Sequence, residues 1–89
     1  MKYNALLSSA SKVARTLRAM SNDHRLKILC HLSEGERTVT QLCDVIGISQ
    51  SALSQHLAKL RQDGLVKTRR QAQNIHYSLA KADINEILT

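Results

Sequence analysis

Residues 38–79 carry a pattern of apolar residues and glycines that permits few folds. The stretch reads TVTQLCDVIGISQSALSQHLAKLRQDGLVKTRRQAQNIHYSL. Apolar residues recur at helical spacing on both sides of Gly47, and after Gly64 the spacing changes to the alternation of strands. Two short helices joined by a tight turn that contains glycine form a helix-turn-helix. The pattern therefore predicts a helix-turn-helix followed by a β-hairpin, the arrangement called a winged helix-turn-helix.

The helices of this motif have recognisable ends. Thr38 or Thr40 can cap the first helix, and Gly47 permits the positive φ of a sharp helix end. Ile48 can fill the corner, and Ser49 can cap the second helix, which we expect over residues 50–63. The inward face of the first helix is expected to comprise Val39, Leu42, Val45 and Ile46. That of the second is expected to comprise Leu53, Leu57 and Leu60.

The rest of the chain also favours helices. Residues 4–20 carry an apolar stripe at alternating spacings of four and three, which suits a dimer seam or a cover for the chain's own core. Its members are Leu6, Ala10, Val13, Leu17 and Met20. Residues 21–23 can cap a second helix that runs to about Ser33, and its apolar residues lie on most sides, which predicts a central, buried helix. Strands are expected at 65–70 and 75–79 with a polar tip at 71–74, and a last helix at 81–88. We predict a mainly α, dimeric fold with one small β-hairpin, in which residues 1–89 form a single domain.

Composition restricts the partners. The 89 residues include 13 Lys and Arg against 7 Asp and Glu, so the net charge is +6 and a polyanionic partner is expected. A chain this small gains stability by burying surface against a second copy, which favours a homodimer. No apolar run approaches the roughly 20 residues that span a bilayer, and no export signal is visible. Two cysteines without a disulfide-dense pattern fit the reducing cytoplasm.

The predicted helix at 50–63 offers an uncharged polar face. Opposite its leucines lies a strip of mostly short side chains: Ser51, Ser54, Gln55, Ala58 and Gln62. An ordinary solvated helix face would carry Lys and Glu, whereas short hydroxyls and amides can enter a DNA groove and hydrogen-bond base edges. Gln50 lies in the first turn, where recognition helices usually touch bases. His56 borders the apolar face, so packing and DNA contact are both open for it. The flanking cations Lys59, Arg61, Arg69 and Arg70 suit phosphates, and Gln73 lies at the wing tip.

These residues also carry a family resemblance. The run SQSALSQHLAKLRQDGLVKTRR and the strand NIHYSL, together with RAMSNDHRLKILCHLSEGE, closely resemble the ArsR/SmtB family of bacterial dimeric winged-helix repressors over about residues 13–80. The resemblance implies a homodimer built on the first and last helices that binds an imperfect inverted repeat in double-stranded DNA. By the same resemblance, Gln50, Ser51, Ser54, Gln55 and His56 match the DNA-reading segment. Arg69 and Arg70 match the wing.

Metal sensing, common in that family, is poorly supported by this sequence. At the start of the third helix the family's thiolate and carboxylate ligands are replaced by residues 38–42, TVTQL. The last segment has Asp83 and Glu86 but no His beyond His76, and His31 with Glu34 lacks a third ligand. We therefore predict no metal and no cofactor, while a metal-responsive repressor of the same fold stays the alternative.

The two cysteines are candidates for a thiol response. Cys30 in ILCHLSEGE, and a wing tip of Gln71-Ala72-Gln73 where many members have Gly, resemble the branch of the family that senses persulfide or oxidant or regulates haemolysin genes. Those sensors carry a second cysteine near the end of the last helix. This sequence stops at Thr89, so either the chain is truncated or that two-cysteine switch is absent. Cys43 could substitute only within disulfide reach. The plainer interpretation is that both thiols are small buried hydrophobes.

Other functional classes have little support. The sequence shows no Gly-rich phosphate loop, no paired carboxylates in a cleft and no nucleophile beside a base, so an enzyme is not expected. A winged helix can also serve as a protein-interaction module. The uncharged polar face and the wing arginines argue against that use.

Overall fold

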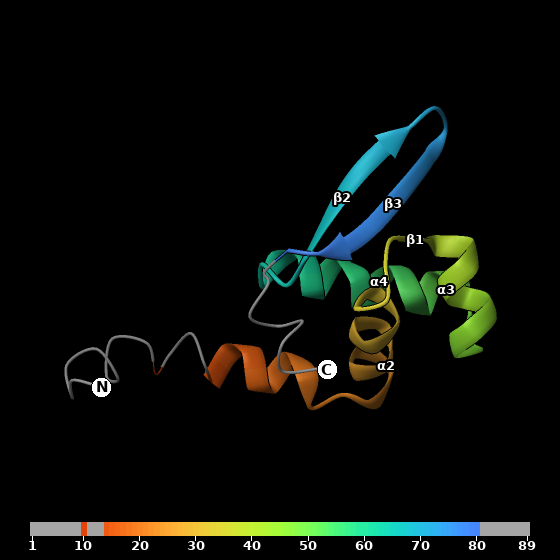
Figure 1. The fold of residues 1–89 in the computed structure, drawn as a ribbon. Coiled ribbons are helices and arrows are strands. Elements are labelled where there is room, and N and C mark those ends of the chain that lie inside the picture. The colour runs from red at the N-terminus through yellow and green to blue at the C-terminus, as the bar shows by residue number, and fades with distance from the viewer. Residues whose placement is uncertain (1–9, 11–13, 81–89) are drawn as a thin grey trace.

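The computed structural model describes residue 10 and residues 14–80. Residues 14–20 are helical. The bounded elements that follow are α2 (Asp23–Leu32), β1 (Arg37–Thr38), α3 (Val39–Ile46), α4 (Gln50–Gln62), β2 (Val66–Gln71) and β3 (Asn74–Leu79) (Figure 1). The predicted mainly α fold with a small hairpin is therefore confirmed. The predicted helix at 81–88 and most of the apolar stripe before residue 14 lie outside the described residues.

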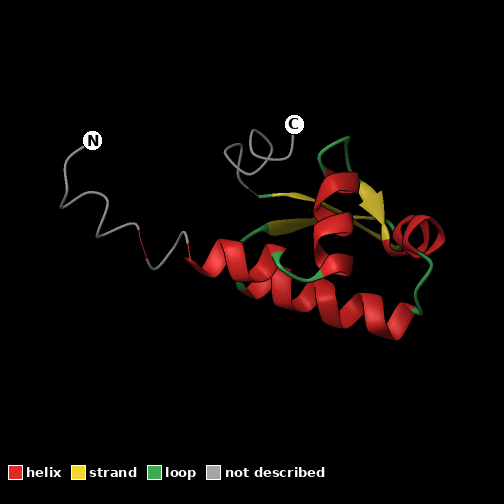
Figure 2. Ribbon diagram, turned by 90° about the horizontal axis from the view of Figure 1, so that it is seen from below, coloured by secondary structure: helices red, strands yellow, loops and turns green. Residues whose placement is uncertain are grey.

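Helix α2 lies at the centre of the fold, as predicted. Asn22 caps it by accepting a hydrogen bond from the Arg25 backbone N–H at 3.1 Å. Ile28 and Leu29 are fully buried, and α2 crosses in front of the strands when the molecule is viewed from below (Figure 2). Its apolar surface is not covered on every side, because Leu26 is 37% exposed and Cys30 is exposed as well.

The helix-turn-helix is built by local capping. Thr38 and Gln41 form a capping box: the Thr38 hydroxyl accepts from the Gln41 N–H, and the Gln41 side chain accepts from the Thr38 N–H. Gly47 ends α3 in the left-handed conformation with φ of 77°, and the Ser49 side chain caps α4 by accepting from the Ala52 N–H. These features confirm the predicted turn and settle the choice between Thr38 and Thr40.

One residue of the predicted inward face of α3 points elsewhere. Leu42 is fully buried, and Val39 and Ile46 pack against the core. Val45 is 54% exposed, so its assignment to the core was wrong. The contact of this short helix with the core is made by Leu42, Val39 and Ile46. Val45 therefore lies at the outer edge of the helix. Ile48 packs against the core, as expected of a residue that fills the corner.

The wing is a three-stranded antiparallel sheet with the order β1-β3-β2. Strand β2 pairs with β3 from Val66 opposite Leu79 to Gln71 opposite Asn74. Strand β2 is shifted by one residue from its predicted limits, whereas β3 begins one residue earlier than predicted and ends at the predicted residue. The two-residue tip is tighter than the predicted polar loop, and Ala72 adopts a positive φ of 57° there. Strand β1 was not predicted, because two residues that pair with β3 leave no periodic signal.

The core joins the helices to the base of the wing. Its buried apolar residues come from the first helical segment, the three bounded helices and the base of the wing. They are Ala19, Ile28, Leu29, Leu32, Leu42, Leu53, Leu57, Leu60, Leu65 and Val66. The segment at 14–20 contributes through Ala19, with Met20 packed beside it, whereas Leu17 is 62% exposed. The first helix therefore covers its own core with one side and leaves an apolar residue uncovered on another.

Candidate nucleic-acid interface

The side of α4 opposite its leucines is uncharged, and its side chains have no partner among the described residues. Its inward side is fixed by Leu53, Leu57 and Leu60, each nearly or fully buried. The opposite side is the polar strip expected from the sequence, and every member is exposed: Ser51, Ser54, Gln55, Ala58 and Gln62. No hydrogen bond within the described residues involves the side chains of this strip or of Gln50. The leucines thus hold in place a set of polar groups whose hydrogen-bonding capacity is free for a ligand.

His56 packs toward α2 rather than out to solvent. Its ring centroid lies 5.6 Å from that of His24, with the planes tilted by 47°. Burial lowers the pKa of His56 below its usual 6.5, and electrostatic interaction with the neighbouring His24 and Arg25 lowers it further. The structure thus favours the packing role that the sequence left open for this side chain.

The cations at the end of α4 differ in their surroundings. The Lys59 ammonium lies 3.7 Å from the Asp63 carboxylate, and both groups belong to the last turn and cap of the helix. Arg61 is exposed, with no ion pair or side-chain hydrogen bond among the described residues. Lys59 is therefore partly neutralised by a neighbour one turn away, whereas Arg61 keeps its full charge at the surface.

The two arginines of the wing are in contrasting states. Arg69 makes a bidentate contact with Glu36: its Nε donates to Oε2 at 3.1 Å and its Nη2 donates to Oε1 at 2.8 Å. Its remaining Nη1 lies 3.4 Å from the Gln71 side-chain oxygen. Arg70, the next residue, is exposed and has no such partner within the described part of the chain. The sequence analysis assigned both arginines the same role. Nothing in the sequence indicated that Glu36, which lies 33 residues before Arg69, would pair with it.

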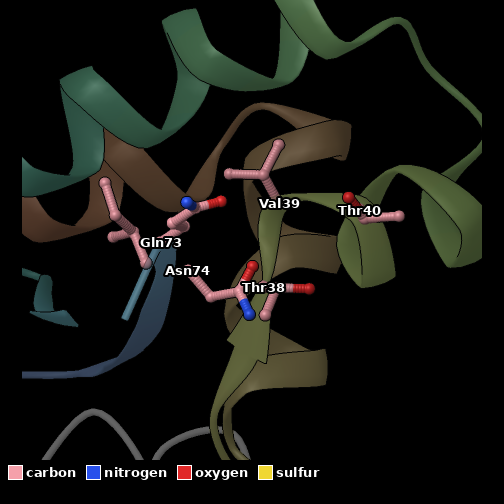
Figure 3. A pocket seen from close by; sticks show the side chains of 6 residues that line it. Thr38, Val39, Thr40, Gln73 and Asn74 are labelled. Carbon is pink, nitrogen blue, oxygen red and sulfur yellow. The ribbon is translucent and has the colours of Figure 1, made fainter. Parts of the chain in front are cut away.

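An open cleft of about 210 Å³ separates the wing tip from the start of α3. Thr38, Val39 and Thr40 form one wall, and Gln73, Asn74 and Ile75 form the other (Figure 3). The wing projects away from the helices from its base beside α4 (Figure 1). Gln73 lies in the turn between β2 and β3, as predicted, and is exposed.

The predicted thiol and metal candidates do not form a common site. Cys30 is exposed on α2, so the expectation of a buried thiol was wrong for it, while Cys43 is partly buried against the core. Both are free thiols. Glu34, considered beside His31, instead pairs with Arg37 at 3.6 Å. Among residues 14–80 no three His, Cys, Asp or Glu side chains gather as metal ligands, and no helix there is long and apolar enough to cross a membrane.

A helix-turn-helix with an uncharged polar outer face, followed by a basic wing, defines the class of winged helix-turn-helix DNA-binding domains. Comparison with known families agrees with this class. The model of the family described as "Bacterial regulatory protein, arsR family" matches residues 22–68. The chain belongs to the arsR family of bacterial regulatory proteins.

Individual relatives and solved structures place the chain within transcriptional regulation. It is 42% identical over 88 residues to the transcriptional activator HlyU of Vibrio cholerae, covering 99% of this chain and 82% of the relative. The crystal structure of the transcriptional repressor BigR from Xylella fastidiosa superposes with a TM-score of 0.89 at 39% identity, covering 99% of this chain and 90% of that one. A homodimeric winged helix-turn-helix DNA-binding domain from Mycobacterium bovis gives a TM-score of 0.84 at 30% identity, covering 98% and 81%.

Proposed function

We propose that this protein is a sequence-specific transcriptional repressor that binds an inverted-repeat operator in double-stranded DNA as a homodimer. The observation that carries the proposal is the exposed polar strip of α4, whose side chains have no partner among the described residues. Side chains of this kind satisfy their hydrogen-bonding groups on base edges in the major groove. Arg70 on the adjoining wing, which has no side-chain partner in residues 14–80, supplies the charge that holds the protein on phosphates.

The proposed contacts divide by chemistry. Side chains of the first turns of α4, namely Gln50, Ser51, Ser54 and Gln55, read base edges, because the N-terminal part of a recognition helix reaches deepest into the groove. The cations Lys59, Arg61 and Arg70 and the wing-tip residue Gln73 are assigned to the sugar-phosphate backbone or the minor groove. Arg69, which the sequence grouped with these cations, is paired with Glu36. His56 supports α4 from behind, through its packing against His24.

The dimer is supported by the surface of a single copy. Leu17 is 62% exposed and Leu26 is 37% exposed, and both lie on the first two helical segments rather than on the DNA-reading unit. Large apolar side chains left uncovered in so small a protein are suited to a subunit interface. The solved relative from Mycobacterium bovis is itself described as homodimeric. Two recognition helices related by a two-fold axis match an inverted repeat.

The wider assignment follows from the same observations. We propose that residues 1–89 form one domain, because all the bounded elements contribute to or border a single core. We also propose that the protein acts in the cytoplasm, where bacterial operators are found, and that it has no enzymatic activity. The relatives support this last point, since they are named as transcriptional regulators.

A gel-shift selection tests the proposed function. Genomic fragments are incubated with the purified protein at two salt concentrations, and the retarded fragments are sequenced. The proposal predicts a small set of fragments that share an inverted repeat and persist at the higher salt, where non-specific binding is lost. Retention of random fragments only, or of none, would contradict it.

We further propose that Cys30 makes the repressor responsive to thiol chemistry. An exposed thiol is accessible to an oxidant or a persulfide donor, and His31 is its neighbour in sequence. A structure of the related HlyU is described as the reduced form. Operator affinity should be measured for the wild type and Cys30→Ser, each with reductant and with a persulfide donor. The donor should weaken only the wild type, whereas equal affinity of the wild type in both conditions would remove the thiol response.

A further inference from the structure

Arg69 on the wing already forms an ion pair within the protein, with Glu36. Both oxygens of the Glu36 carboxylate accept a hydrogen bond from Arg69: Oε1 from Nη2 at 2.8 Å and Oε2 from Nε at 3.1 Å. This is the bidentate geometry in which an arginine also holds a phosphate. A DNA phosphate that approached Arg69 would therefore compete with a carboxylate for the same donors.

The position of Glu36 is set by the strand pairing of the sheet. It immediately precedes β1, whose residues Arg37 and Thr38 pair with Tyr77 and His76 of β3. On the other side of β3, Arg69 of β2 is paired with the same His76. Strand β3 therefore lies between β2 and the segment that carries Glu36, and the side chains of Glu36 and Arg69 meet across it.

The electrostatics agree with a standing ion pair. The hydrogen bond from Arg69 is the largest cause of the lowered pKa of Glu36, so the carboxylate is ionised at neutral pH. Within the pair the charges cancel, whereas Arg70 has no partner in the described part of the chain. Two adjacent arginines therefore present different charges to a polyanion: one is neutralised, and one is free.

We infer that Glu36 withholds Arg69 from DNA, so that Arg69 ties the wing to the body of the domain while Arg70 makes the arginine contact of the wing. Glu36 is a positioning residue in this arrangement, and it sets how many phosphates the wing neutralises. The inference rests on the proposed DNA-binding function and revises the role that the sequence suggested for Arg69. Removal of the Glu36 carboxylate frees Arg69 to contact a phosphate.

The salt dependence of DNA binding measures this directly. Each neutralised phosphate changes the slope of log K against log salt concentration by about 0.9 for duplex DNA. Binding of the full chain to one random-sequence duplex is titrated over a salt series for four proteins: the wild type, Glu36→Gln, the double variant Glu36→Gln/Arg69→Gln, and Arg70→Gln. The double variant keeps the net charge of the wild type, which separates a lost contact from a change in overall charge.

The inference predicts three results. Glu36→Gln steepens the slope by about 0.9, the double variant returns to the wild-type slope, and Arg70→Gln flattens the slope by about 0.9. Circular dichroism confirms that each variant is folded, which is expected because Glu36 and Arg69 are 38% and 52% exposed.

Two outcomes overturn the inference. A double variant whose slope is flatter than that of the wild type by about one contact would show that Arg69 leaves Glu36 and holds a phosphate in the complex. A Glu36→Gln slope equal to that of the wild type would show that the carboxylate withholds nothing. A wild-type protein that binds no duplex at any salt would instead remove the proposed function, so the two failures are distinguishable.

Discussion

Replacement of Gln55 by alanine should lower the affinity for the operator without changing non-specific binding. Gln55 is exposed in the middle of the polar strip of α4, and its amide has no hydrogen-bond partner within the described residues. Its replacement therefore removes no contact within that part of the protein. A glutamine that contacts an adenine edge through two hydrogen bonds contributes about 1–3 kcal/mol of discrimination against other bases. Operator affinity should therefore fall by about 5- to 150-fold.

The assay is fluorescence anisotropy with the selected operator and a random duplex of the same length, at one fixed salt concentration. Gln62→Ala is the matched control, since it removes the same amide from the same strip. At 1.5 Å per residue, Gln62 lies about 10 Å farther along α4, beyond the turns that reach the bases. Its replacement should leave the ratio of the two affinities unchanged. If Gln55→Ala lowered operator and random-sequence binding equally, the assignment of the reading face would be refuted.

Three further predictions concern the scaffold. Leu17→Asp should dissociate the homodimer, because it would bury an unpaired charge at the seam, and a monodisperse wild-type monomer in sedimentation would exclude the dimer itself. Leu57→Ala should lower the free energy of unfolding by about 2–5 kcal/mol through lost burial and a cavity, measured by urea denaturation, and a loss below 1 kcal/mol would contradict the packing described. His56 has a lowered pKa in the folded state, so as the pH falls this side chain binds a proton at a higher pH in the unfolded chain than in the folded protein. Stability should therefore fall as the pH drops below about 6.5, and His56→Gln should weaken that fall; an unchanged pH dependence would argue against His56 as its source.

Much of this fold was predictable because its signals are local. The caps at Asn22, Thr38 and Ser49 and the left-handed Gly47 act within four residues, so the sequence contains both the signal and its partner. The leucines of α4 repeat over three turns, which fixes the inward face and, by exclusion, the polar strip. The candidate reading residues were found in this way, as the exposed complement of a buried pattern.

The parts that sequence reasoning missed depend on contacts between distant segments. Strand β1 exists only because β3 offers it an edge, and two residues carry no alternation of their own. Glu36 acquires its role from an arginine 33 residues later. Val45 and Cys30 were misjudged because periodicity identifies an apolar side of a helix but not whether another element is present to cover it.

Hydroxyl-radical footprinting of the selected operator tests the central claim most directly. A dimer that reads DNA with two copies of α4 predicts two protected segments whose centres lie one helical turn apart, about 34–36 Å. The double variant Ser54→Ala/Gln55→Ala should lose this pattern at concentrations where it still binds random DNA. A single protected segment, or the same weak protection along the whole fragment for both proteins, would contradict the claim that this chain is a dimeric, sequence-reading repressor.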